Sequence, residues 1–229
     1  MPEKNSQILE YDSEESLLLL EFMLNENFKL QLYRSEKIIY GFDHHNEKAF
    51  EYKLPLVFPV FGEEDTLSAY YKRLQDKLPD YLIILMQAGT CALGYFEETK
   101  LDSHKVIRKY MVRAKQSKAQ IKHLTNKGKS KAGSRVRLAQ TKDFFEEINE
   151  KLLEWEVENV HSIVYSAGIS LWNLMFEAKT LPPFEKKDKR LLKIPKDIQN
   201  PSYEELLEIN RFISTSSLTL YKEINLDFL

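Results

Sequence analysis

Apolar and polar positions along the N-terminal third of the chain predict alternating helices and strands. Residues 15–24 have the apolar spacing of an amphipathic helix, whereas residues 28–34 alternate with the period of a half-buried strand. A second extended run follows at residues 50–61. Residues 63–78 return to helical spacing, and Pro79 is expected to end that helix. This part of the chain therefore predicts both kinds of element.

The middle of the chain predicts a three-stranded meander and then a helix. Residues 81–112 contain three apolar or alternating runs, and Gly89 marks the turn between the first two. A helix is expected at residues 141–156. One of its faces carries the apolar side chains of Phe145, Ile148, Leu152 and Trp155. We interpret this face as part of the core.

The C-terminal part continues the alternation of strands and helices. Residues 159–168 are typical of a buried strand that ends in glycine, residues 169–179 of a helix and residues 191–195 of a short strand. A last helix is expected to follow the capping box formed by Ser202 and Glu205.

These elements predict an α/β fold. We expect one mixed β-sheet of about five or six strands with helices on its faces. Residues 1–62, which contribute a helix and strands, are assigned to the same domain as the core at residues 63–229.

Composition narrows the class of protein. With 229 residues, 43% of them apolar, the chain can bury a sizeable core. Its longest apolar stretches, residues 54–61 and 81–86, are far shorter than the roughly 20 residues of a membrane-spanning helix. The polar, acidic start lacks the regions of a signal peptide, so we expect a cytoplasmic protein with no membrane partner. The single cysteine, Cys91, excludes an internal disulfide, and its apolar surroundings predict burial.

Positive charge is concentrated in one part of the chain. Residues 103–142 hold thirteen Lys or Arg and no Asp or Glu, which leaves 20 basic against 35 acidic residues elsewhere. A basic run of this kind is usually a solvated loop. The contrast in sign also fits a loop that docks on a phosphate backbone while the acidic body repels nucleic acid in general. Both interpretations are open at this point.

Gln120 stands in the centre of this run. Its amide cannot act as a general base, but it can position a water and donate to developing negative charge. The cations around it are suited to hold the phosphates of an RNA substrate. The RNA-binding candidates are Arg113, Lys115, Lys118, Lys122, Lys127, Lys129, Lys131, Arg135 and Arg137.

Other chemistry-bearing residues fit no catalytic pattern. His104 and His123 lie at the edges of the basic run and could contact RNA or transfer a proton, although their spacing does not require it. Ser166 lacks the frame of a nucleophile elbow. Gly128 and Gly133 are too isolated for a Walker-type phosphate loop. We expect no metal and no cofactor.

Three stretches resemble the Vms-like release factor family, relatives of the catalytic middle domain of the eukaryotic peptide-chain release factor. They are HKVIRKYMVRAKQSKAQ, KAGSRVR and DKRLLKIPKDIQNPSYEEL, which occur in the family's order and with similar spacing over roughly residues 82–212. The lead-in Arg113, Ala114 and Lys115 is present, and Gln120 stands where the family glutamine stands. Ser117 takes the place of the glycine in the family's G-x-x-Q arrangement, which restricts the backbone there.

The resemblance implies a fold, partners and a site. The fold is a release-factor middle-domain core of the RNase H-like type, with a basic glutamine loop at residues 113–137 that enters the peptidyl-transferase centre. The implied partners are the large ribosomal subunit and peptidyl-tRNA, and no DNA is expected. The zinc-finger and ankyrin regions of eukaryotic members are missing, so we expect a compact bacterial stand-alone member.

Three hypotheses for function follow. The first is an enzyme that frees stalled nascent chains, either by ester hydrolysis with a water held by the glutamine or by cleavage of the tRNA acceptor end through a ribose 2′-OH. The second is a non-catalytic ribosome- or RNA-binding factor that uses the basic loop. The third is an α/β domain with a solvated surface loop.

Overall fold

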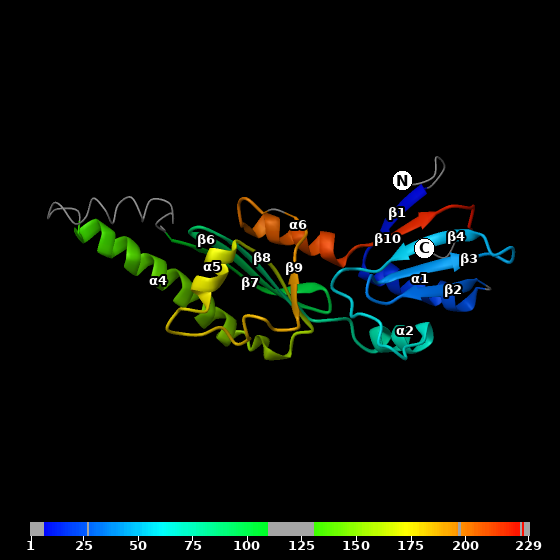
Figure 1. Cartoon of the computed structure of the whole chain (residues 1–229), viewed down its shortest axis with the longest axis horizontal. Helices are drawn as coiled ribbons and strands as arrows, with labels where there is room; N and C mark the ends of the chain where they lie inside the picture. Colours follow the sequence, from blue (N-terminus) through cyan, green and yellow to red (C-terminus); the bar gives the residue numbers. More distant parts are fainter. Residues whose placement is uncertain (1–6, 27, 110–130, 197, 225, 227–229) are drawn as a thin grey trace. The chain divides into compact units, whose positions relative to one another are not determined.

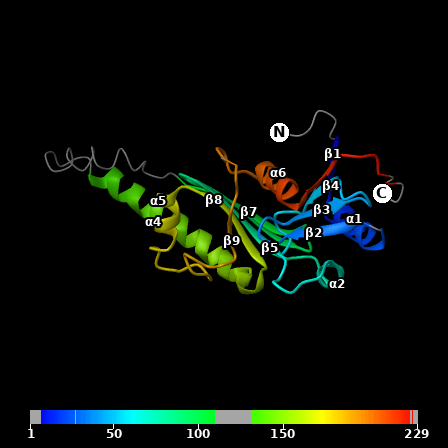
Figure 2. The ribbon, with the colours of Figure 1, turned by 45° about the vertical axis from the view of Figure 1, so that its right-hand side comes forward.

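The protein consists of two compact units. The computed structural model describes residues 7–26, 28–109, 131–196, 198–224 and 226, and it describes only the backbone of residues 131–140. The first unit contains the described residues up to Pro79, Glu97–Thr99 and those from Glu208 onward. The second unit contains Asp80–Phe96 and the described part of Lys100–Leu207 (Figure 1; Figure 2 shows the same chain from another side).

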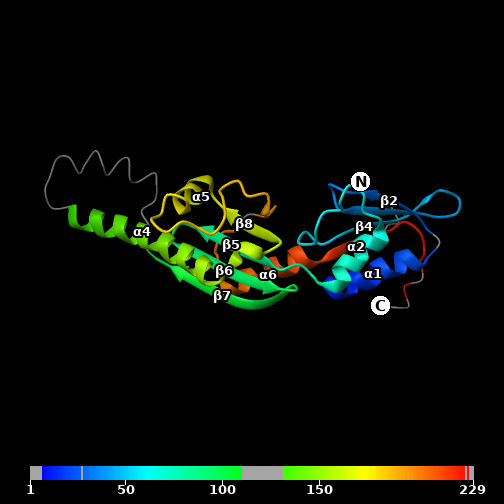
Figure 3. The same ribbon diagram turned by 90° about the horizontal axis from the view of Figure 1, so that it is seen from below.

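The first unit is built on an antiparallel five-stranded sheet. In spatial order its strands are β1 (Gln7–Tyr11), β10 (Ser216–Leu220), β4 (Lys48–Lys53), β3 (Ile38–Phe42) and β2 (Lys29–Tyr33). Helices α1 (Ser13–Asn25) and α2 (Leu67–Asp76) pack against each other beside it (Figure 3). A capping box starts α1, since Asp12 accepts from the Glu14 and Glu15 amides and Glu15 accepts from the Asp12 amide.

The second unit is built on a mixed five-stranded sheet. In spatial order its strands are β7 (Lys100–Arg108), β6 (Thr90–Glu97), β5 (Tyr81–Gln87), β8 (Ser162–Ala167) and β9 (Leu191–Lys193). Strand β5 is antiparallel to β6 and parallel to β8, which is parallel to β9. The described helices of this unit are α4 (Lys131–Glu154) and α5 (Ile169–Met175), and a 3-10 turn (Val157–Asn159) follows α4. Helix α6 (Tyr203–Ser214) belongs to this unit as far as Leu207.

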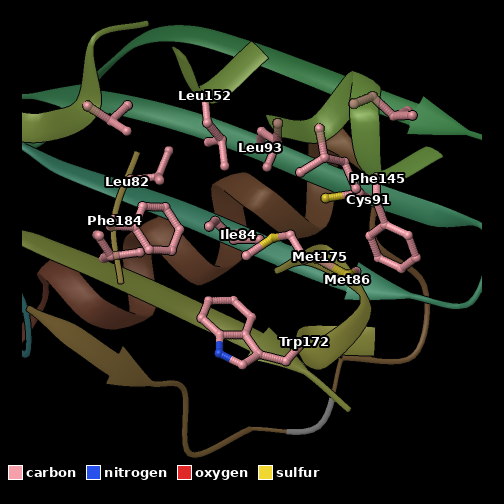
Figure 4. Close-up of a cluster of buried hydrophobic side chains, with 14 of the residues drawn as sticks. Leu82, Ile84, Met86, Cys91, Leu93, Phe145, Leu152, Trp172, Met175 and Phe184 are labelled. Carbon is pink, nitrogen blue, oxygen red and sulfur yellow. The ribbon is translucent and has the colours of Figure 1, made fainter. Parts of the chain in front are cut away.

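Helices α4 and α5 cover one face of the mixed sheet. The shared core, drawn in Figure 4, takes Ile84 from β5, Leu93 from β6, Phe145 from α4 and Trp172 from α5. The start of α6 packs on the other face, where Leu206 approaches the backbone of β6. Cys91 is fully buried in the core, and desolvation raises the pKa of its thiol, so this cysteine is not a reactive nucleophile.

The elements predicted for the second unit are confirmed. Its meander, the strand before Gly168, the helix after it and the short strand at β9 all form. The predicted helix at residues 141–156 also forms, but α4 begins ten residues earlier, at Lys131. Among the described helices, none combines the length and the apolar character needed to span a membrane.

The prediction of one sheet is wrong, because the described residues form two sheets of five strands each. The predicted extended run at residues 50–61 is a strand only as far as Lys53. Beyond that residue the chain turns at two prolines with Val57 and Phe58 buried. The Lys37 ammonium donates to the carbonyls of Leu56 and Phe58, which satisfies backbone acceptors outside the sheet.

Contact between β6 and α6 depends on a glycine. A Cβ atom on Gly94 would lie 2.7 Å from Cδ2 of Leu206 and 2.8 Å from Cε2 of Phe96. We therefore expect Gly94→Ala to lower the free energy of unfolding by about 1 to 3 kcal/mol through overpacking. Urea denaturation followed by tryptophan fluorescence measures this, because both tryptophans, Trp155 and Trp172, belong to the second unit.

Gly168→Ala is the matched control for this prediction. A Cβ atom at Gly168 would meet no atom within 4 Å, and its φ of −67° is allowed for alanine. The free energy of unfolding should change by less than about 0.5 kcal/mol. Equal midpoints for both variants and the wild type would contradict the tight β6–α6 contact.

Candidate functional site

The candidate site lies at one edge of the mixed sheet. A two-residue turn with positive φ at Glu98 (46°) and Thr99 (70°) joins β6 to β7, which is the geometry of an antiparallel hairpin. Strand β7 therefore runs in the direction of β5, and the carboxyl ends of β5, β7, β8 and β9 share one edge. Binding residues in α/β folds commonly lie outside this edge.

The basic run leaves the sheet at this carboxyl edge. The described chain stops at Lys109, one residue after β7, and resumes at the first residue of α4. The predicted catalytic Gln120 lies outside the described residues, as does His123. The same holds for the RNA-binding candidates Arg113, Lys115, Lys118, Lys122, Lys127 and Lys129. Lys131, Arg135 and Arg137 belong to the part of α4 of which only the backbone is described.

The strand that leads into the basic run is fixed at its end. The Lys109 amide donates to the Gly89 carbonyl at 2.9 Å, which ties the end of β7 to the β5–β6 turn. The Lys109 ammonium donates to the Asp143 carbonyl at 3.1 Å and pairs with Glu147 at 2.8 Å. Lys105, on the same face of β7, lies 4.0 Å from the Glu147 carboxylate. Glu147 of α4 therefore links the helix to β7 and to the residue that follows it, through Lys105 and Lys109.

The helix that follows the basic run is fixed by two further side chains. The Asn149 amide is fully buried and donates to the carbonyls of Met175 at 2.8 Å and Thr180 at 2.7 Å. The Glu146 carboxylate accepts from the Lys179 and Thr180 amides. Hydrogen bonds from Thr180, and then from Lys179, lower the pKa of Glu146. The C-terminal half of α4 is thus locked to the segment after α5.

Charge changes sign along α4. Residues 131–142 contain four basic and no acidic residues, whereas residues 143–154 contain five acidic residues and only Lys151 as a cation. Cations at a helix N-terminus oppose the helix dipole and destabilise the helix. Helix stability therefore does not explain why the first half of α4 is basic.

The structure adds residues that the sequence analysis did not nominate. The anchor of β7 on α4 consists of the ion pairs that Glu147 makes with Lys105 and Lys109. The Asn149 clamp is the pair of hydrogen bonds by which this side chain joins α4 to the Met175 and Thr180 carbonyls. The two-residue period of β7 was a usable signal, because it places Lys105 and Lys109 on one face. His104 lies on the opposite face, with its ring 4.5 Å from that of Tyr203. Among the described residues, no group of three or more His, Cys, Asp or Glu is placed to hold a metal ion.

Comparison with known proteins connects the chain to release factors and to tRNA endonucleases. A family model described as Bacteroidetes VLRF1 release factor matches residues 81–220. The chain is 28% identical over 158 residues to tRNA endonuclease ANKZF1 of Homo sapiens. It is also 28% identical over 149 residues to tRNA endonuclease vms-1 of Caenorhabditis elegans. These alignments cover 66% and 63% of the chain but only 21% and 23% of the two relatives.

One solved structure has a similar fold over most of the chain. The Vms1 mitochondrial localization core matches with a TM-score of 0.50 at 13% identity, covering 94% of this chain and 85% of that one. At this identity the match concerns the fold alone.

The Asn149 clamp predicts a large decrease in stability on substitution. Asn149→Ala leaves the Met175 and Thr180 carbonyls without their donor, and we expect the free energy of unfolding to fall by about 2 to 4 kcal/mol. Glu150→Gln, on an exposed position of the same helix, should change it by less than about 0.5 kcal/mol. Urea denaturation of both variants tests this, and equal stabilities would show that the clamp contributes nothing.

Proposed function

The chain belongs to the Bacteroidetes VLRF1 release factor family, and from this premise we propose that it frees stalled nascent chains by acting on peptidyl-tRNA at the large ribosomal subunit. The observation that carries the proposal is the isolated basic run, which begins within β7, passes the strand end held by Lys109 and continues into α4. Thirteen cations without an acidic residue are suited to an RNA environment. The acidic remainder of the chain limits binding to RNA elsewhere.

The second unit fits the architecture that this function needs. We propose that its mixed sheet and long α4 form the release-factor middle-domain core of the RNase H-like type. In this assignment the sheet positions residues 113–137, with the β7 end and the clamped half of α4 as the two fixed points. The large ribosomal subunit and peptidyl-tRNA are the proposed partners, and the cytoplasm is the proposed location.

For the reaction we propose cleavage of the tRNA acceptor end, because both curated relatives are named tRNA endonucleases. A ribose 2′-OH loses its proton while its oxygen attacks the neighbouring phosphorus, and the bond from phosphorus to the next 5′ oxygen breaks as that oxygen gains a proton. Gln120 donates its amide hydrogens to the phosphate as charge develops, and Arg113 and Lys115 stabilise the same charge. Hydrolysis of the peptidyl ester by a water held on Gln120 is the alternative chemistry.

A non-catalytic RNA-binding factor is the second candidate function. Ser117 stands in the place of the family glycine, three residues before Gln120, and a side chain there restricts the backbone beside the amide. This factor would keep the binding cations and lack the chemistry.

We predict that Gln120→Leu abolishes release of the nascent chain and leaves ribosome association nearly unchanged. In the proposal the amide acts on the reacting group, whereas the cations of the basic run bind RNA phosphates. The assay incubates the protein with ribosome-nascent-chain complexes and resolves both released peptide and the tRNA 3′ end on a gel. Gln116→Leu, four residues earlier in the same run, is the matched control and should keep activity. Undiminished release by Gln120→Leu would favour the binding factor.

We also predict that the cations of the run set the salt dependence of ribosome binding. Replacing Lys127, Lys129 and Lys131 with glutamine should weaken binding and reduce the log-log salt slope by about one unit for each phosphate that is no longer neutralised. Co-sedimentation with ribosomes across a salt series measures the slope. Melting temperatures should change little if these cations contact RNA and not the protein, because such substitutions usually alter stability by less than about 0.5 kcal/mol.

The matched control removes three charges elsewhere. Lys186, Lys187 and Lys189 are exposed in the loop before β9, and their replacement with glutamine should leave the slope unchanged. If both triple variants bind as the wild type does at every salt concentration, the basic run is a solvated loop without an RNA partner.

A further inference from the structure

A groove of about 580 Å³ opens on the second unit, beside the strand that leads into the basic run. Strand β7 forms its floor, and α4 and α6 form its sides. Its lining residues are Lys105, Val106, Ile107, Arg108, Glu147, Tyr203 and Glu204. All of them belong to the described part of the second unit.

Strand β7 is the edge strand of its sheet, so the groove is open to a ligand. Within the described residues no strand pairs with the outer side of β7. Its side chains alternate between two faces: Lys105 lies near α4, and His104 lies against Tyr203 of α6. Arg108 shares the α6 face with His104, and its charge acts on Glu204. The groove therefore presents a cation on each side of the strand.

The two carboxylates that line the groove already have partners. Glu147 pairs with Lys109 at 2.8 Å. A backbone hydrogen bond at Glu204, then the Ser202 hydroxyl and the charge of Arg108, lower the pKa of Glu204. The Arg108 side chain is exposed, and although its charge acts on Glu204, no hydrogen bond or ion pair joins it to a residue in the described ranges. Its guanidinium is available for an external anion.

An exposed aromatic side chain completes the groove. Tyr203 is 38% exposed at the first position of α6, and its ring centroid lies 4.5 Å from that of His104 at an angle of 42°. An accessible aromatic ring beside an exposed guanidinium is a combination that recognises nucleotides, because the ring stacks on a base and the cation contacts a phosphate.

We infer that this groove binds one nucleotide of an RNA strand, with Arg108 on a phosphate and Tyr203 stacked on a base. The inference rests on the proposed function and extends it, since it adds a binding subsite built on the sheet rather than on residues 113–137. RNA is a better occupant of the groove than an acidic peptide. Lys105, Arg108 and Lys109 are the first cations of the basic run, and the rest of that run is the segment proposed to contact RNA. Val106, which is half-buried on the same face of β7 as Arg108, supplies apolar contact for a base.

The test compares groove variants in RNA binding. Arg108→Gln should weaken binding about fivefold to tenfold and lower the log-log salt slope by about one unit, as expected for one phosphate contact. Tyr203→Ala should weaken binding about tenfold because the base can no longer stack on a ring. Tyr203→Phe keeps the ring, so it should bind RNA as the wild type does. The probes are deacylated tRNA, the same tRNA with its single-stranded 3′ end removed, and purified large ribosomal subunits.

Leu207→Ala and Lys187→Gln are the matched controls. Leu207 lies one turn after Tyr203 on α6 with the same exposed fraction of 38%, and it does not line the groove. Lys187 is an exposed cation in the loop before β9. Both controls should bind every probe as the wild type does, and thermal melts of all variants confirm folding.

The outcomes separate the inference from the proposed function. Weaker binding of tRNA alone identifies tRNA as the occupant, and weaker binding of subunits alone identifies ribosomal RNA. If both Arg108→Gln and Tyr203→Ala bind all three probes as the wild type does, the inference that the groove binds a nucleotide is wrong, even if Gln120→Leu is inactive in release. Weakened binding by the groove variants together with full activity of Gln120→Leu supports the groove and overturns the catalytic assignment.

Discussion

One buried amide joins α4 to α5 and to the segment that follows α5. Asn149 has no exposed surface, and its two donors go to the Met175 carbonyl at the end of α5 and to the Thr180 carbonyl beyond it. The last carbonyls of a helix have no partner within that helix, so this side chain stabilises the end of α5 while it fixes α4. Glu146, one turn earlier, binds the amides of the same segment. Since a helix is stiff, holding its C-terminal half also sets the direction of its N-terminal half.

The two halves of α4 therefore have different roles. The acidic half contributes Phe144, Phe145 and Ile148 to the core and Glu147 to the anchor of β7. The basic half carries charges that oppose the helix dipole. Packing energy from one half can offset this unfavourable charge in the other, because the helix forms as a cooperative unit. A phosphate partner would remove the conflict, so binding of RNA and stability of the first turns of α4 are coupled in the proposed function.

How far the sequence predicted the fold depended on the distance between contacting residues. The meander of the second unit was predicted correctly because its turns are short and Gly89, with a φ of 87°, marks one of them. The first sheet was missed because β10 lies between β1 and β4, and the pairing of Gln7 with Leu220 joins the two ends of the chain. Periodicity carries no information about such a pairing. The first turns of α4 were assigned to the basic loop because their Gly, Ser and Lys composition resembles a loop.

The candidate site divides in the same way. Gln120 came from the resemblance and its side-chain chemistry, and it lies outside the described residues. Asn149 was missed because a polar residue beside Ile148 and Leu152 is expected to face solvent. Here two backbone carbonyls accept from its NH2 group, while its buried Oδ1 has no partner among the described residues. Its two acceptors lie at the end of α5 and beyond it, and they reach α4 only through tertiary packing, which no local sequence pattern predicts.

In the proposed function, strand β7 would both support α4 and contact the RNA. The side chains that face α4 fix the strand to that helix through Glu147. The side chains that face α6 include His104 and Arg108, which lie near Tyr203. A ligand contact on a strand is preorganised by the sheet, so little conformational entropy is lost when it forms. Such a contact can supply binding free energy away from the reacting bond, and an enzyme can use that free energy to orient the substrate at the catalytic group. In the proposed function the groove would hold one nucleotide of the RNA while Gln120 acts on another position, which relates the rigid part of the second unit to the chemistry of the basic run.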